Sequence, residues 1–174
     1  MCYLLPMDRG DPHVLEEGHH PTPFTAADIR AASRPGRTVR QRIEVDGEAT
    51  VLRIQQWVSA DDEGATRVVG TLRADGSWTD VRRSRSTWLA LQGHASMPIE
   101  TTTIEEVTLD SPMGPLVCLR YTALDGDAIE TFWFARDYPG MPVMTERTEN
   151  GRVVERVTML SSQVEPLRDE PGAS

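Results

Sequence analysis

Residues 113–143 read MGPLVCLRYTALDGDAIETFWFARDYPGMPV, and this stretch decides the fold. Two runs rich in β-branched and aromatic residues flank the pair Asp125-Gly126. An Asx-Gly pair between such runs is the strongest short-range signal of a β-hairpin, because the residues of its tight turn need positive φ angles. The stretch therefore predicts two antiparallel strands, followed by a corner rich in proline and glycine.

The register of this hairpin follows from placing Asp125 and Gly126 at the turn. Tyr121 is then expected to lie opposite Glu130. Side chains alternate between the two faces of a strand. One face should carry Val117, Leu119, Tyr121, Ala123, Glu130, Phe132 and Phe134. The other should carry Leu116, Cys118, Arg120, Thr122, Ile129, Thr131 and Trp133. Since both faces hold large apolar groups, we expect a central hairpin that is covered on both sides.

Composition limits the classes of protein to which the chain can belong. A chain of 174 residues fits one domain, and its net charge of -9 disfavours nucleic acid and anionic membrane surfaces as partners. Two cysteines, Cys2 and Cys118, make neither a disulfide framework nor a metal site. The N-terminal sequence lacks the basic start and long apolar run of a secretory signal, so we expect a cytoplasmic protein.

The chain ends differ in composition from the rest of the sequence. Residues 1–21 are rich in proline, glycine, histidine and acidic residues without apolar periodicity, so we expect a disordered tail. Residues 22–165 should form a single β-rich domain, and residues 166–174 a second disordered tail. His13, His19 and His20 are expected to be solvated in the first tail rather than to bind a metal.

Four Asx-Gly pairs, at residues 46–47, 75–76, 125–126 and 150–151, predict four hairpins. The first hairpin should place Val39 and Ile54 on one apolar face. Thr25 is a good cap for one short helix, and a second is expected near residues 87–95. The fold class is therefore mainly β: a curled antiparallel meander of about nine strands, a half-barrel or barrel, with one or two short helices.

The segments SPMGPLVCLRY, at 111–121, and ETFWFARDYPGMPV, at 130–143, resemble a pattern in bacterial β-proteins of unknown function. Those proteins are similar to the half-barrels of the lipoprotein-carrier, LolA-like superfamily. The resemblance covers residues 107–160 and implies a curved antiparallel sheet around an apolar concavity. It carries over no catalytic residues.

Catalytic signatures are absent from the sequence: it has no glycine-rich phosphate loop, no nucleophile elbow and no HExxH motif. His94 could act as a general base, but no partner for it is evident. Cys118 has the apolar strand neighbours of an inert core cysteine. Tyr121 opposite Glu130 is the one polar pair that could supply an acid and a base, or anchor a ligand.

We predict a small binding module for an apolar molecule. Its expected ligand-binding residues are Leu119, Tyr121, Glu130, Phe132 and Phe134. Two alternatives stay open: a structural or protein-interaction subunit, as a homodimer or in a complex, and a cofactor-free barrel enzyme such as a cyclase or isomerase. We expect no cofactor and no bound metal.

Overall fold

The structure is a computed structural model that describes residues 10–168. The two helices in this range are α1 (Ala26–Ala32) and α2 (Trp88–Gly93). The first strands are β1 (Arg37–Val45), β2 (Val51–Ala60), β3 (Gly64–Leu72), β4 (Trp78–Thr87) and β5 (Thr102–Ser111). The others are β6 (Gly114–Asp125), β7 (Ala128–Ala135), β8 (Met144–Glu149) and β9 (Arg152–Val164).

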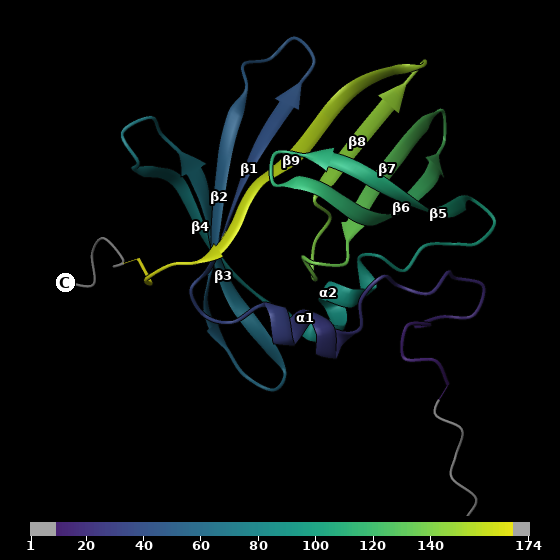
Figure 1. The fold of residues 1–174 in the computed structure, drawn as a ribbon, viewed down its shortest axis with the longest axis horizontal. Helices are drawn as coiled ribbons and strands as arrows, with labels where there is room; N and C mark the ends of the chain where they lie inside the picture. The colour runs from purple at the N-terminus through teal and green to yellow at the C-terminus, as the bar shows by residue number, and fades with distance from the viewer. Residues whose placement is uncertain (1–9, 169–174) are drawn as a thin grey trace, which may run out of the picture.

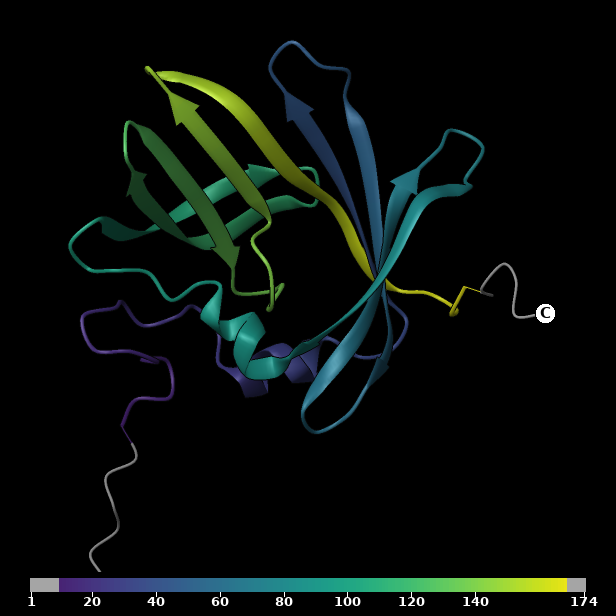
Figure 2. The same ribbon diagram turned by 180° about the vertical axis from the view of Figure 1, so that it is seen from behind.

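All nine strands within residues 10–168 form one antiparallel sheet in the order β4-β3-β2-β1-β9-β8-β7-β6-β5. The sheet curls into two wings, β1–β4 and β5–β9, and both helices lie at one end between them (Figures 1 and 2). Because β4 and β5 do not pair, the sheet stays open. The mainly β prediction is thus confirmed in its half-barrel form, and the closed barrel is not formed.

Local sequence explains the turns and the first helix. The four Asx-Gly pairs join β1 to β2, β3 to β4, β6 to β7 and β8 to β9. Their glycines, Gly47, Gly76, Gly126 and Gly151, all have positive φ angles. Thr25 and Asp28 form the reciprocal hydrogen bonds of a capping box at the start of α1.

Two predicted registers were wrong. In the hairpin of β6 and β7, Tyr121 pairs with Phe132 and Ala123 pairs with Glu130. This shift of two residues keeps every side chain on its predicted face. In the hairpin of β1 and β2, Ile54 pairs with Arg40, so the shift is one residue and places Ile54 on the face opposite Val39. The connection is longer than two residues, and a one-residue slip exchanges the faces of a strand.

One face of the sheet, which we call the inner face, runs through cross-strand pairs from β2 to β5. Its central row is Val51, Ile43, Val157, Thr145, Phe132, Tyr121 and Ile104. Ile29 of α1 and Trp88 of α2 are buried in one cluster with Val39 and Trp57 of this face. The helices therefore cover one end of the inner face.

The opposite face of the central hairpin is buried at the end away from the turn, whereas Leu124 and Ile129 of that face are exposed near the turn. Leu116, Cys118 and Trp133 are at most 8% exposed and belong to the main core cluster. The predicted coverage on both sides of β6 and β7 is thus formed over only part of the hairpin. In the part of the chain that is described, neither helix is long and apolar enough to cross a membrane.

Residues 10–21 correct the prediction of a disordered tail that ends at residue 21. His13 Nδ1 donates to the Thr22 carbonyl oxygen at 2.6 Å, and His20 Nε2 donates to that of Thr102 at 2.7 Å. His19 and Pro98 form an isolated β-bridge. The sequence does not predict these contacts, because hydrogen bonds between polar groups that are distant in sequence produce no apolar periodicity. The part of that tail at residues 1–9 lies outside the described residues.

The domain also extends beyond residue 165, at which the sequence predicted its C-terminal end. Beyond β9, Glu165 forms an ion pair with Arg40 at 2.7 Å. The side chain of Gln56 then bonds to the backbone of Pro166 and Arg168, and the Arg168 guanidinium lies 4.5 Å from the centre of the Trp78 ring. Residues 166–168 thus pack on β2 and β4 instead of forming a tail, and residues 169–174 lie outside the described range.

Candidate functional site

The five residues predicted to bind a ligand stand on the inner face, but in different environments. Tyr121 is only 1% exposed, and its hydroxyl donates to the Pro21 carbonyl oxygen at 2.6 Å. Burial raises the pKa of Tyr121 to about 12. Its ring meets Phe134 edge-on with 5.2 Å between the ring centres. Leu119 packs against the same aromatic cluster.

Glu130 lies apart from this cluster, near the turn of the hairpin. Its carboxylate accepts from Arg147, which also donates to Glu149 at 2.8 Å and to Asp125 at 3.2 Å. The predicted pairing of Tyr121 with Glu130 is therefore not formed, because the register differs and each group has another partner. The acid–base pair on which the enzyme hypothesis depended is absent.

Phe132 and Phe134 line a cavity of about 160 Å³ between the helices and the inner face, which we call the inner cavity. Their rings stack with 6.2 Å between centres. Leu119, Tyr121 and Glu130 do not line this cavity. The remaining walls come from segments distant in sequence, including Phe24, Leu91 and Met141.

The other candidate chemical groups stand alone. His94 is exposed at the end of α2 and also lines the inner cavity. Cys118 is 1% exposed, and burial raises the pKa of its thiol, which disfavours the reactive thiolate. Among residues 10–168, no group of three or more histidine, cysteine, aspartate or glutamate side chains could hold a metal ion.

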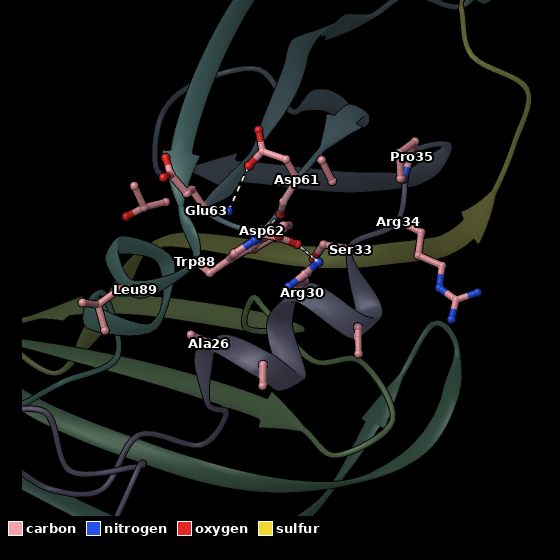
Figure 3. Close-up of a pocket in the computed structure, with 14 residues that line it drawn as sticks. Ala26, Arg30, Ser33, Arg34, Pro35, Asp61, Asp62, Glu63, Trp88 and Leu89 are labelled. Carbon is pink, nitrogen blue, oxygen red and sulfur yellow. Dashed lines mark hydrogen bonds and ion pairs between the residues drawn. The ribbon is translucent and has the colours of Figure 1, made fainter.

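A larger, open groove of about 730 Å³ lies outside the inner cavity (Figure 3). Its walls are α1 with the following turn, the β2–β3 turn and the start of α2, and its lining residues fall within 26–35, 60–63 and 87–89. We call it the α1 groove. The sequence does not predict this groove, because none of the three segments carries a motif and only the fold brings them together.

A polar network holds the β2–β3 side of the α1 groove. The Asp61 carboxylate accepts from Arg85 at 2.7 Å and from the backbone N–H groups of Glu63 and Gly64. The Arg85 hydrogen bond and then the two backbone bonds hold the pKa of Asp61 at about 2. Trp88 Nε1 donates to the Asp61 carbonyl oxygen at 2.8 Å, which joins this turn to α2.

The floor and rim of the groove are more apolar. Ala26, Ala27 and Ala31 present the surface of α1, and the Leu89 side chain is 61% exposed at the far rim. Arg30 of α1 forms an ion pair with Asp62 of the β2–β3 turn, and the two side chains meet across the groove in Figure 3. The site is thus an open trough with small apolar residues and a single exposed ionic bridge.

No family model matches the chain, and no curated protein matches it. Among solved structures it is similar to MucB, with 12% identity and a TM-score of 0.54 over 83% of this chain and 60% of MucB. It is also similar to MucB in complex with MucA(peri), with 19% identity and a TM-score of 0.56 over 85% of this chain and 59% of that one.

A putative exported protein with a YmcC-like fold, from Bacteroides fragilis NCTC 9343, matches at 8% identity and a TM-score of 0.48, over 75% of this chain and 97% of that one. The chain thus spans about 60% of the length of the MucB chains that it matches. At these identities the MucB likeness shows a shared fold alone. The more specific resemblance to LolA-like half-barrels stays a prediction.

Proposed function

We propose that the chain is a protein-interaction module that binds a segment of a partner protein in the α1 groove. The observation that carries this proposal is the groove itself, an open trough of about 730 Å³ beside α1. The fold supports it, because the similar protein MucB is known in a complex with MucA(peri).

The groove has the chemistry of a peptide-binding surface. The alanines of α1 let a partner backbone approach closely, and the exposed Leu89 side chain offers apolar area that a partner can cover. The Arg30–Asp62 ion pair is half-exposed on one side and 90% exposed on the other. Exposed ion pairs contribute little stability, so a partner can displace this one at low cost.

The charged residues at the two ends of the groove indicate which charges the partner segment should carry. Glu63 and Arg34 are exposed lining residues, and their side chains form no ion pair among residues 10–168. A basic side chain of the partner would pair with Glu63, and an acidic one with Arg34. We therefore infer a segment with small apolar residues between a basic and an acidic residue.

Site-specific photo-crosslinking tests this proposal. A benzoylphenylalanine at position 89 should crosslink to one partner segment, identified by mass spectrometry, whereas the same group at Leu124 should not. Leu124 is a matched control because it is 58% exposed but lies in the central hairpin. A synthetic peptide of the captured segment should bind the Ala27→Arg variant at least about tenfold more weakly. Equal capture at both positions, or unchanged peptide affinity, would contradict the proposal.

A second candidate function is the binding of a small apolar molecule in the inner cavity. The supporting observation is that Phe132 and Phe134, two of the residues predicted from sequence, line a partly open and mainly apolar space. Apolar cavities with a few polar groups are the usual form of small-molecule sites. Leu119, Tyr121 and Glu130 would then support the cavity wall and not touch the ligand.

A further inference from the structure

The wall of the inner cavity contains a cation, Arg67, that has no counter-ion among the described residues. Arg67 of β3 lines the cavity and donates from Nη1 to the Gln55 side-chain oxygen at 3.0 Å. Its guanidinium carbon lies 5.8 Å from the centre of the Trp57 ring. Among residues 10–168 it forms no ion pair. Loss of hydration, and then the positive charge of Arg53, lower the pKa of Arg67.

Arg37 lies against the same tryptophan, Trp57, but its guanidinium has more hydrogen-bond acceptors than that of Arg67. It lies 5.0 Å from the centre of the Trp57 ring, and burial lowers its pKa to about 10. Four oxygens accept its N–H groups, on Ala32, Ser33, Pro139 and Ser162. A guanidinium has five N–H donors, and Arg67 uses one of them in a hydrogen bond to residues 10–168. Arg67 therefore has donors left for a ligand.

Besides Arg67, the polar side chains that line the cavity include those of Ser33, Gln92 and His94. The Gln92 side chain accepts from the Ala26 N–H group and donates to Pro12 and Thr22, so its hydrogen bonds are satisfied. His94 stands at the exposed edge, and its ring forms no hydrogen bond with the part of the chain that is described. No carboxylate side chain lines the cavity.

We propose that the inner cavity binds a small apolar carboxylic acid, whose carboxylate pairs with Arg67 and whose apolar part lies between Phe132, Phe134 and Leu91. Charge complementarity selects the acid, because arginine and a carboxylate form paired hydrogen bonds. The volume of the inner cavity limits the apolar part of the acid to a single ring or a short acyl chain, since a cavity of about 150 Å³ holds benzene. This inference rests on the second candidate function, small-molecule binding.

The test compares two fluorinated probes of equal shape by ¹⁹F NMR titration of the full chain. 4-Fluorobenzoate should bind saturably and at least tenfold more tightly than the neutral 4-fluorobenzamide. Arg67→Gln should abolish that preference, whereas Arg73→Gln, at an exposed arginine outside the cavity, should retain it. Leu91→Trp, which fills the cavity and keeps Arg67, should remove binding of both probes, with folding of each variant checked by its thermal transition.

The possible results distinguish the inference that the ligand is an acid from the small-molecule binding on which it rests. Equal affinities for the acid and the amide, or an unchanged preference in Arg67→Gln, would overturn the acid inference and leave small-molecule binding in place. If neither probe nor a short-chain acid such as hexanoate binds, both fall. Binding that survives Leu91→Trp would place the site elsewhere and overturn the inference.

Discussion

At the turn between β6 and β7, Gly126 has a φ of +59°, and at the turn between β8 and β9 Gly151 has a φ of +76°. Nothing within 4 Å would meet a Cβ atom at either position, so conformation and not space requires glycine. Gly126→Val and Gly151→Val should each lower the free energy of unfolding by roughly 1 kcal/mol or more. Urea denaturation measures this loss.

Gly10→Val is the control for these two variants, because Gly10 also has open space around it but no positive φ. Its stability should change little. Unchanged stability in both hairpin variants would mean that the turns are not tight hairpin turns.

The lowered pKa of Asp61 predicts that the stability of the fold depends on pH. Its pKa of about 2 lies below the ordinary aspartate value of 3.8. A carboxyl with a lowered pKa in the folded protein adds stability that is present above pH 3.8 and lost as the pH falls towards 2. Asp61→Asn should therefore be less stable than the parent chain at pH 5, and the difference should shrink between pH 4 and pH 2. Chemical denaturation at each pH measures it.

Asp110→Asn is the matched control, since Asp110 is exposed and its carboxylate forms no hydrogen bond or ion pair with residues 10–168. Removing its carboxylate should leave the pH dependence close to that of the parent chain. A constant stability difference between Asp61→Asn and the parent across this range would refute the linkage.

At the scale of elements, the N-terminal segment behaves as part of the domain. The His20 N–H group donates to Met97, the Ile99 N–H group donates to Gly18, and Pro21 accepts from the Tyr121 hydroxyl. A chain that begins at residue 22 should thus be less stable than one that begins at residue 10, by at least about 1 kcal/mol. Thermal and urea unfolding of the two chains give the difference.

A double-mutant comparison sharpens this prediction. Tyr121→Phe should destabilise the chain that begins at residue 10, because the hydroxyl loses the Pro21 acceptor. The same substitution should be neutral or stabilising in the chain that begins at residue 22, where the hydroxyl is buried without that acceptor. Equal effects in both chains would show that the segment is not docked as described.

For the whole molecule, the two open edges of the sheet decide how copies of the chain can associate. β4 carries Arg82, Arg83 and Arg85, and β5 carries Glu105, Glu106 and Asp110. Pairing two β4 edges, or two β5 edges, would place like charges opposite one another. Pairing β4 with β5 is head-to-tail, so it cannot form a dimer through a single self-complementary edge.

We therefore expect the mass of a single chain in a native mass spectrum at low micromolar concentration. Removing an edge charge, in Arg82→Thr, should increase association. A stable dimer of the unmodified chain would instead favour the homodimer that the sequence left open, and it would require a surface other than the sheet edges.

The sequence by itself determined the strands, the turns and most of the faces, because these depend on neighbouring residues. Asx-Gly pairs located four hairpins, and alternation placed Phe132 and Phe134 on one face of the central hairpin, whatever its register. A register shift of two residues leaves each side chain on the same face of its strand, so the predicted faces of β6 and β7 are correct although the register is not. The shift of one residue at β1 and β2 reversed the face of Ile54, because the loop length was not evident in the sequence.

Only the tertiary structure decided where the two candidate sites lie. The α1 groove joins segments near residues 30, 61 and 88, and the inner cavity joins Arg67 to Phe132 across the curled sheet. It also fixed residues 10–21 to the domain through hydrogen bonds to residues about 80 positions away. Such contacts depend on how the sheet curls, and polar contacts between distant residues produce no periodicity that a sequence can display.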